Sequence, residues 1–189
     1  MDLIENALIF ATQAHSGQKR KNSTTPYILH PIEAAVIAST ITDDPEIIAA
    51  VILHDTVEDT DVTSDDIRTE FGDRVADIVA GDTEDGQDDV SREESWLSRK
   101  KNSLSILAQS NCDIKIMWLS DKLSNMRSFC RMYQQEGDDM WQHFHQKDKA
   151  IQEWYYRSIA DSLSELKDTE AYREYIDRVN LVFGRNEDE

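Results

Sequence analysis

Residues 47–59, IIAAVILHDTVED, place seven consecutive apolar residues directly before a His-Asp pair. The Asp-Asp-Pro sequence at 43–45 predicts the cap and first residue of a helix here, since Asp is a favoured cap and Pro is tolerated at the first helical position. A helix that is apolar on all sides is typical of the centre of a fold. We therefore expect a central helix that runs straight into His54 and Asp55.

The polar end of this segment gathers four groups that can bind a cation. Two pairs, His54 with Glu58 and Asp55 with Asp59, stand one helical turn apart and project to the same side. An acidic run is often only a solvated helix face. Here the aspartate follows an apolar run, where an unpaired charge is costly to desolvate, so the pattern favours a metal site.

Two residues distant in the sequence can complete such a site. His30 and Asp121 would add a second imidazole and a second carboxylate to His54 and Asp55. This ligand mixture suits manganese, iron or zinc better than magnesium or calcium, and the residue types alone do not select among the three.

Apolar residues at helical spacing cover most of the remaining chain, and no alternating strand pattern stands out. Besides the central helix, we expect helices near residues 2–15, from Pro31 through 37, and near 64–71, 74–79, 91–108, 114–133, 140–166 and 172–182. The acidic stretch 81–91 is predicted to be a mobile loop. The fold class is all-α, with residues 1–189 as one domain.

Composition narrows the class of partner. The chain has 38 acidic and 20 basic residues and a formal net charge of −18, which argues against nucleic-acid binding. It has no apolar run of the roughly 20 residues that cross a bilayer, so we expect a cytoplasmic protein with no membrane partner. Its two cysteines are predicted to be buried or half-buried free thiols. The sequence is also compatible with a homo-oligomer.

Five segments together resemble the hydrolase domain of the RelA/SpoT homologue family, and in particular its single-domain small alarmone hydrolases. In family order they are AHSGQKRK (14–21), PYILHP (26–31), AAVILHDTVEDT (49–60), FGDRVADIV (71–79) and LSDKLSNMRS (119–128). The resemblance implies an all-α, HD-domain helical bundle.

The resemblance also implies roles for residues at the matching positions. Four match the family's ligands to one divalent metal, typically manganese: His30, His54, Asp55 and Asp121. Glu58 and Asp59 match the carboxylates that position and deprotonate the attacking water.

The implied substrate contacts are of three kinds. Arg20 and Lys21 match a pair that lies over the nucleotide and its phosphates, and Asn125 matches an asparagine near the ribose. A tyrosine usually stacks near the base, and Tyr155 is our candidate within the aromatic run 154–156. Residues 99–101, Arg-Lys-Lys, could reach the distal diphosphate, although short basic runs are usually solvated.

The implied activity is removal of the 3′-diphosphate from a guanosine alarmone, ppGpp or pppGpp, to give pyrophosphate and GDP or GTP, as in the stringent response. One alternative is an HD phosphohydrolase acting on an adenosine alarmone, NADPH or a nucleoside 5′-monophosphate. Another is a nucleotide-binding module without turnover. In each case the partner is a small-molecule nucleotide.

Overall fold

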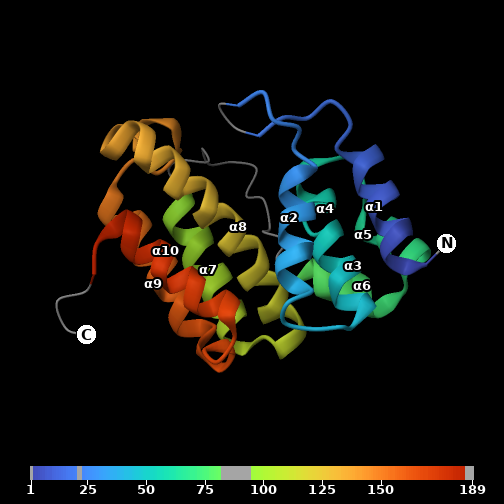
Figure 1. The fold of residues 1–189 in the computed structure, drawn as a ribbon. Coiled ribbons are helices and arrows are strands. Elements are labelled where there is room, and N and C mark those ends of the chain that lie inside the picture. Colours follow the sequence, from blue (N-terminus) through green and yellow to red (C-terminus); the bar gives the residue numbers. More distant parts are fainter. Residues whose placement is uncertain (1, 21–22, 82–94, 186–189) are drawn as a thin grey trace.

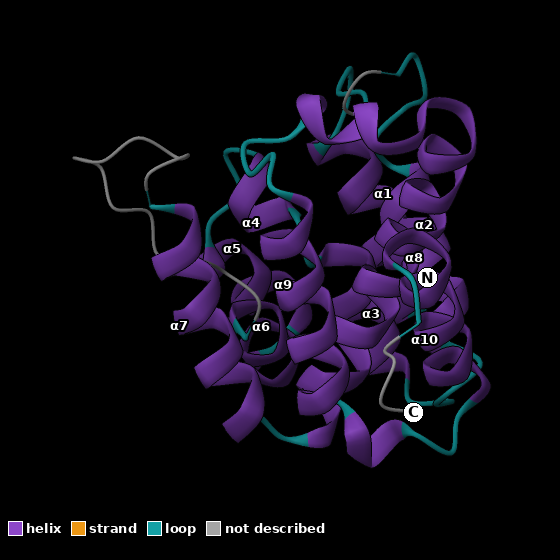
Figure 2. Cartoon of the chain, turned by 90° about the vertical axis from the view of Figure 1, so that its left-hand side faces the viewer, coloured by secondary structure: helices purple, strands orange, loops and turns teal. Residues whose placement is uncertain are grey.

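A computed structural model describes residues 2–20, 23–81 and 95–185 of the chain. The regular secondary structure of this described part is helical, apart from a single antiparallel bridge between Lys19 and Pro26 (Figure 2). The predicted all-α class is confirmed. Among the described residues, no helix combines the length and apolar character needed to cross a bilayer.

The helices follow one another along the chain with short connections (Figure 1). Their bounds are α1 Leu3–Ala14, α2 Leu29–Ala38, α3 Pro45–Leu53, α4 Thr56–Asp59, α5 Ser64–Phe71, α6 Asp73–Ala80, α7 Trp96–Gln109, α8 Cys112–Glu136, η1 Gly137–His143, α9 Lys149–Ser162, η2 Ser164–Leu166 and α10 Glu170–Phe183. The two η segments are 3₁₀ helices.

Helix α3 is the centre of the N-terminal half. Asp44 caps it by accepting from the Glu46 backbone N–H, and Pro45 is its first residue, as predicted. All seven residues of 47–53 are buried, and the helix packs against α1, α2, α6 and α8. The apolar run is thus surrounded by other helices, and it fixes where the residues that follow it are placed.

Helix α8 joins the two halves of the molecule. It is 25 residues long and packs against α2 and α3 on one side and α10 on the other. Figure 1 shows α1 to α6 gathered on one side of it and α7, α9 and α10 on the other. A residue on the α2-facing side of α8 therefore lies close to the end of α3.

The structure corrects three predicted boundaries. Helix α2 begins at Leu29 rather than Pro31; proline is tolerated in this first turn because its missing N–H has no intrahelical partner there. The helix expected over 140–166 is instead η1, α9 and η2, because Asp148 caps a new helix by accepting from Ala150 and Ile151 N–H.

The third correction lies at the His-Asp pair. The central helix ends at Leu53, His54 and Asp55 form a turn, and α4 begins at Thr56. The loop predicted at 81–91 falls, apart from Gly81, outside the described residues. Cys112 and Cys130 are free thiols, as predicted, and Cys130 is buried; the expected burial is wrong for Cys112, which is exposed near the start of α8.

Candidate metal centre

Four side chains from three parts of the chain meet between α2, α8 and the end of α3. His30 Nε2 lies 3.0 Å from Asp121 Oδ1 and 3.5 Å from Asp55 Oδ2. His54 Nε2 lies 3.1 Å from Asp55 Oδ2 and 3.6 Å from Asp121 Oδ1. Two ligands that bind one ion at about 2.1 Å and at right angles are about 3 Å apart, so this spacing fits a common ion.

The local backbone explains how neighbouring residues reach one site. His54 and Asp55 keep right-handed helical angles although the helix is interrupted. The Asp59 N–H still bonds to the Asp55 carbonyl at 2.9 Å. The one-turn spacing of Asp55 and Asp59 expected from the sequence therefore persists through the turn.

The chemistry of His54 tests whether these residues fit a cation. Its Nδ1 donates to the Val51 carbonyl at 2.7 Å, so in the neutral ring Nε2 carries a lone pair. That nitrogen is buried, has no hydrogen-bond partner in the described part of the chain, and faces the oxygens of Asp55 and Asp121. A lone pair facing two carboxylates is stabilised by a positive charge between them, so the donor set fits a divalent metal.

Electrostatics at the site agree with this interpretation. Burial alone would lower the pKa of His54, but the carboxylates of Asp55 and Asp121 raise it well above its usual value. Burial does lower the pKa of His30, outweighing the opposite effect of Asp121. Burial would raise the pKa of Asp121, yet Lys122 and the histidines hold it well below its usual range. The carboxylates at this site are therefore ionised, and their negative charge favours a positive charge between them.

Neighbouring donors fix the two carboxylates. The Tyr27 hydroxyl donates to Asp55 Oδ2 at 2.7 Å, and burial, with Asp55 and Asp59 nearby, raises the pKa of this tyrosine so that it stays protonated. Asn125 Nδ2 donates to Asp121 Oδ1 at 2.7 Å, and Lys122 Nζ pairs with Asp121 Oδ2.

A cavity of about 200 Å³ opens onto this cluster. Glu58 and Asp59, at the end of α4, line it together with His30, Asp55 and Asp121. Both α4 carboxylates are exposed, unlike the buried histidines. Three cationic side chains also line it: Arg20, Lys100 and Lys122. The cavity thus places two accessible carboxylates and three cations around the candidate metal ligands.

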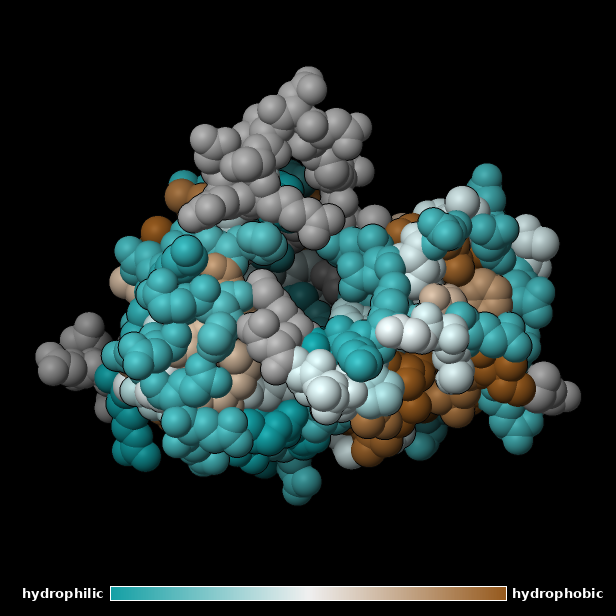
Figure 3. All heavy atoms as spheres, turned by 90° about the horizontal axis from the view of Figure 1, so that it is seen from above, coloured by the Kyte–Doolittle hydropathy of each residue, from teal (hydrophilic) through white to brown (hydrophobic). Residues whose placement is uncertain are grey.

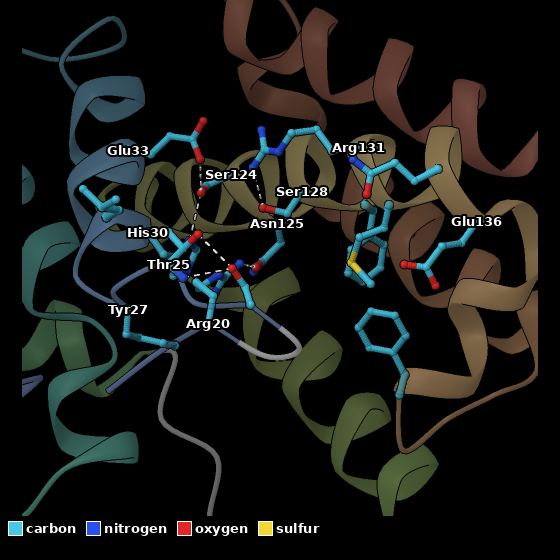
Figure 4. A pocket seen from close by; sticks show the side chains of 16 residues that line it. Arg20, Thr25, Tyr27, His30, Glu33, Ser124, Asn125, Ser128, Arg131 and Glu136 are labelled. Carbon is cyan, nitrogen blue, oxygen red and sulfur yellow. Dashed lines mark hydrogen bonds between the residues drawn. The ribbon is translucent and has the colours of Figure 1, made fainter. Parts of the chain in front are cut away.

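A larger cavity of about 510 Å³ lies on the other side of Arg20 (Figure 4). Four residues line both cavities, Arg20, Tyr27, His30 and Asn125, and Arg20 Nη2 donates to Asn125 Oδ1 at 2.9 Å. Apolar residues are part of the larger wall only: Leu29, Phe129, Met132 and Phe144. In a view from above, Figure 3 shows a hollow in the middle of the molecule with a mostly hydrophilic described rim.

The other predicted substrate contacts are placed differently. Lys21 lies outside the described residues. Tyr155 is 3% exposed, stacks edge-on against Trp96 in the core, and lines neither cavity. Of the basic run 99–101, Lys100 lines the smaller cavity and lies 5.1 Å from the Tyr155 ring centre.

Sequence reasoning missed three side chains at the centre. Tyr27 and Lys122 lie inside the quoted motifs PYILHP and LSDKLSNMRS but were given no role. Ser124, which also lies in LSDKLSNMRS, places its Oγ 2.8 Å from His30 Nδ1. A hydroxyl one helical turn from a candidate ligand was the available signal, since α8 positions 121, 124 and 125 share a face.

Comparison with known proteins identifies the class. A family model described as the HD domain matches residues 7–150. The chain therefore belongs to the HD-domain family.

Its relatives within that family are of the RelA/SpoT type. A guanosine-3′,5′-bis(diphosphate) 3′-pyrophosphohydrolase of Aquifex aeolicus is 38% identical over 125 residues, which are 66% of this chain and 17% of that protein. A GTP pyrophosphokinase of Myxococcus xanthus is 32% identical over 142 residues, 72% of this chain and 18% of the relative. The chain thus spans less than a fifth of the length of these curated relatives.

Two solved structures are similar over most of their length. One is a metazoan ortholog of SpoT that hydrolyzes ppGpp and plays a role in starvation responses. Its TM-score is 0.73 and its identity 26%, covering 95% of this chain and 94% of that one. The other, from Listeria monocytogenes EGD-e, has a TM-score of 0.72 and 31% identity over 82% of this chain and 99% of its own.

Proposed function

We propose that this chain is a metal-dependent hydrolase that removes the 3′-diphosphate from guanosine alarmones such as ppGpp, releasing pyrophosphate and leaving GDP or GTP. The observation that carries the proposal is one cavity whose wall includes His30, Asp55 and Asp121 beside the accessible carboxylates of Glu58 and Asp59, with the buried His54 Nε2 3.1 Å from Asp55 Oδ2. The similarity to the metazoan SpoT ortholog, which covers nearly all of both chains, supports the same activity.

The metal would be held by His30, His54, Asp55 and Asp121, and we propose manganese. Two imidazoles and two carboxylates suit that ion. When bound, a divalent cation supplies Lewis acidity that makes water nucleophilic near neutral pH and polarises a phosphoryl oxygen.

The exposed carboxylates have a different role. Glu58 and Asp59 lie at the end of α4 and line the smaller cavity together with His30, Asp55 and Asp121. A carboxylate there can accept the proton of that water and hold its oxygen toward the phosphorus. The proposed proton acceptors are thus separate from the metal ligands, although Glu58 and Asp59 lie only a few residues after His54 and Asp55 in the sequence.

Cations near the carboxylates meet the negative charge of the substrate. A net charge of −18 repels a polyphosphate at long range, so attraction must come from local groups. Arg20, Lys100 and Lys122 line the smaller cavity and can each contact phosphate oxygens. We place the diphosphate in this cavity.

The larger cavity would take the nucleoside. Its volume, about 510 Å³, is within the usual range for small-molecule sites. Apolar side chains beside Ser128 and Asn125 offer both a surface for a base and hydrogen bonds for a ribose. Arg20, on the boundary, can reach either part of the substrate.

We further propose that residues 1–189 act as one catalytic domain in the cytoplasm. Support for one unit comes from α8, which packs against helices of both halves. Two unpaired thiols fit a reducing compartment.

A substrate panel tests the proposal directly. Metal-stripped protein, with and without added Mn²⁺, would be given ppGpp, pppGpp, the adenosine counterparts, NADPH and GMP, and pyrophosphate and phosphate release would be measured. We expect pyrophosphate from the guanosine alarmones with Mn²⁺ and none after chelation. Turnover only of another compound, or binding of ppGpp without turnover, would replace the proposal by one of its alternatives.

A further inference from the structure

The two candidate histidine ligands are oriented by different kinds of hydrogen-bond partner. His54 Nδ1 donates to a main-chain carbonyl, that of Val51. His30 Nδ1 instead faces a side chain, the hydroxyl of Ser124, at 2.8 Å. Only the second contact can be removed by substitution, so only there does the orientation depend on which residue the sequence supplies.

The direction of the hydrogen bonds follows from the partners of Ser124. Its Oγ lies 2.7 Å from Glu33 Oε2 (Figure 4). Glu33 also accepts from Arg127 Nη1 at 3.3 Å. A serine hydroxyl has one proton, and a carboxylate accepts it, so Ser124 donates to Glu33. The serine oxygen is then left as an acceptor, and the hydrogen between it and His30 belongs to the imidazole.

We propose that Ser124 and Glu33 are positioning residues that hold His30 with its proton on Nδ1 and its lone pair on Nε2, facing Asp121 and Asp55. This inference rests on the proposed metal centre, because Nε2 is the nitrogen that would bind the ion. A histidine ligand commonly donates its other N–H to a fixed acceptor, which sets both tautomer and ring angle.

The burial of the contact between His30 and Ser124 supports this role. Ser124 is 1% exposed and His30 4% exposed, so their contact is shielded from bulk solvent. Without it, the imidazole N–H would be buried with no acceptor, which is costly unless the proton moves to Nε2. A proton on Nε2 would occupy the lone pair that the metal needs.

The outer end of the network is tied to a third helix. Arg127 donates twice to Glu174 of α10, at 2.9 and 2.7 Å, and once to Glu33 of α2. Each of these three side chains is about 30% exposed, so solvent screens this end. We therefore expect the loss of Ser124 to weaken metal binding more than the loss of Glu33, and the loss of Glu33 more than the loss of Glu174.

The first test observes the tautomer without any metal or substrate. Histidine ring ¹⁵N shifts in the metal-free protein distinguish a protonated Nδ1 from a protonated Nε2. We expect His30 of the native protein to show the Nδ1–H form and Ser124→Ala to lose it. An Nδ1–H form that persists unchanged in Ser124→Ala would overturn the inference, whether or not the protein proves to be an alarmone hydrolase.

The second test measures Mn²⁺ affinity by titration of metal-stripped protein. Ser124→Ala should weaken binding about tenfold or more, Glu33→Gln by less, and Ser124→Thr, which keeps the hydroxyl, should restore it. Ser120→Ala is the matched control, because Ser120 is also fully buried on α8 and its hydroxyl donates to the Ile116 carbonyl of its own helix. Equal losses in Ser120→Ala and Ser124→Ala, or failure of Ser124→Thr to restore affinity, would contradict a specific role. Unfolding midpoints show whether each variant is folded.

Discussion

The two cavities on either side of Arg20 differ in the side chains that line them. The smaller is lined by charged and polar side chains around Asp55 and Asp121, whereas apolar side chains such as Met132 and Phe144 form part of the larger. Dense charge suits a reacting phosphate, and a mixed wall suits a nucleoside. Changes in the smaller cavity should therefore act mainly on kcat, and changes in the larger mainly on KM.

The largest effect should follow loss of a metal ligand. Asp121→Asn keeps the shape of the buried side chain and removes its charge, so we expect metal content to fall and turnover to drop by about 1000-fold or more. Metal analysis and pyrophosphate release measure the two quantities. Asp113→Asn, elsewhere on α8, is the control; full activity with full metal content in Asp121→Asn would remove this residue from the centre.

Loss of a proposed proton acceptor should come next. We expect Glu58→Gln or Asp59→Asn to lower kcat by about 100-fold while metal stays bound, because the ligands remain intact. Single-turnover rates and metal analysis test this, with Asp61→Asn as an exposed control in the same segment. Near-normal turnover in both variants would show that water is activated elsewhere.

Filling the larger cavity should affect binding. Met132→Trp adds bulk to its wall at a residue that does not line the smaller cavity, and we expect KM for ppGpp to rise about tenfold with kcat little changed. Tyr133→Trp on the same helix is the control, since Tyr133 lines neither cavity. A tenfold fall in kcat would contradict the assignment of substrate binding to the larger cavity and catalysis to the smaller one.

Arg20, which lines both cavities, should have a smaller effect. Arg20→Ala, alone or with Lys21→Ala, should raise KM a few-fold and flatten its rise with ionic strength, because a phosphate contact is screened by salt. KM would be measured at low and high salt, beside Lys19→Ala as an exposed control. Unchanged values and slopes would place Arg20 outside the substrate site.

The smallest effect is expected for Tyr155. Because its ring packs in the core and lines neither cavity, Tyr155→Phe should leave KM within about twofold of the native value. A tenfold increase in KM, with an unchanged unfolding midpoint, would instead mean that the Tyr155 hydroxyl contributes to substrate binding.

The structure also shows which features of the fold could be predicted from sequence patterns. The cap at Asp44 and the central position of α3 followed from local rules, because capping and all-round apolarity depend on neighbouring residues. The single helix expected over 140–166 was wrong, since Asp148 starts a new helix within it. The role proposed for Tyr155 stays a prediction, and its place in the core shows that an aromatic motif alone does not specify which cavity a ring reaches.

The sequence by itself determined the residue types of the candidate centre and the helices that carry them. His54 and Asp55 follow an apolar run that must be buried, so their location near the core was decided by local pattern and the hydrophobic effect. Only the tertiary structure decided that α2 and α8 pack so that His30, Asp121 and Ser124 meet this turn. Contacts between residues about ninety positions apart depend on helix packing, which periodicity within one helix does not encode.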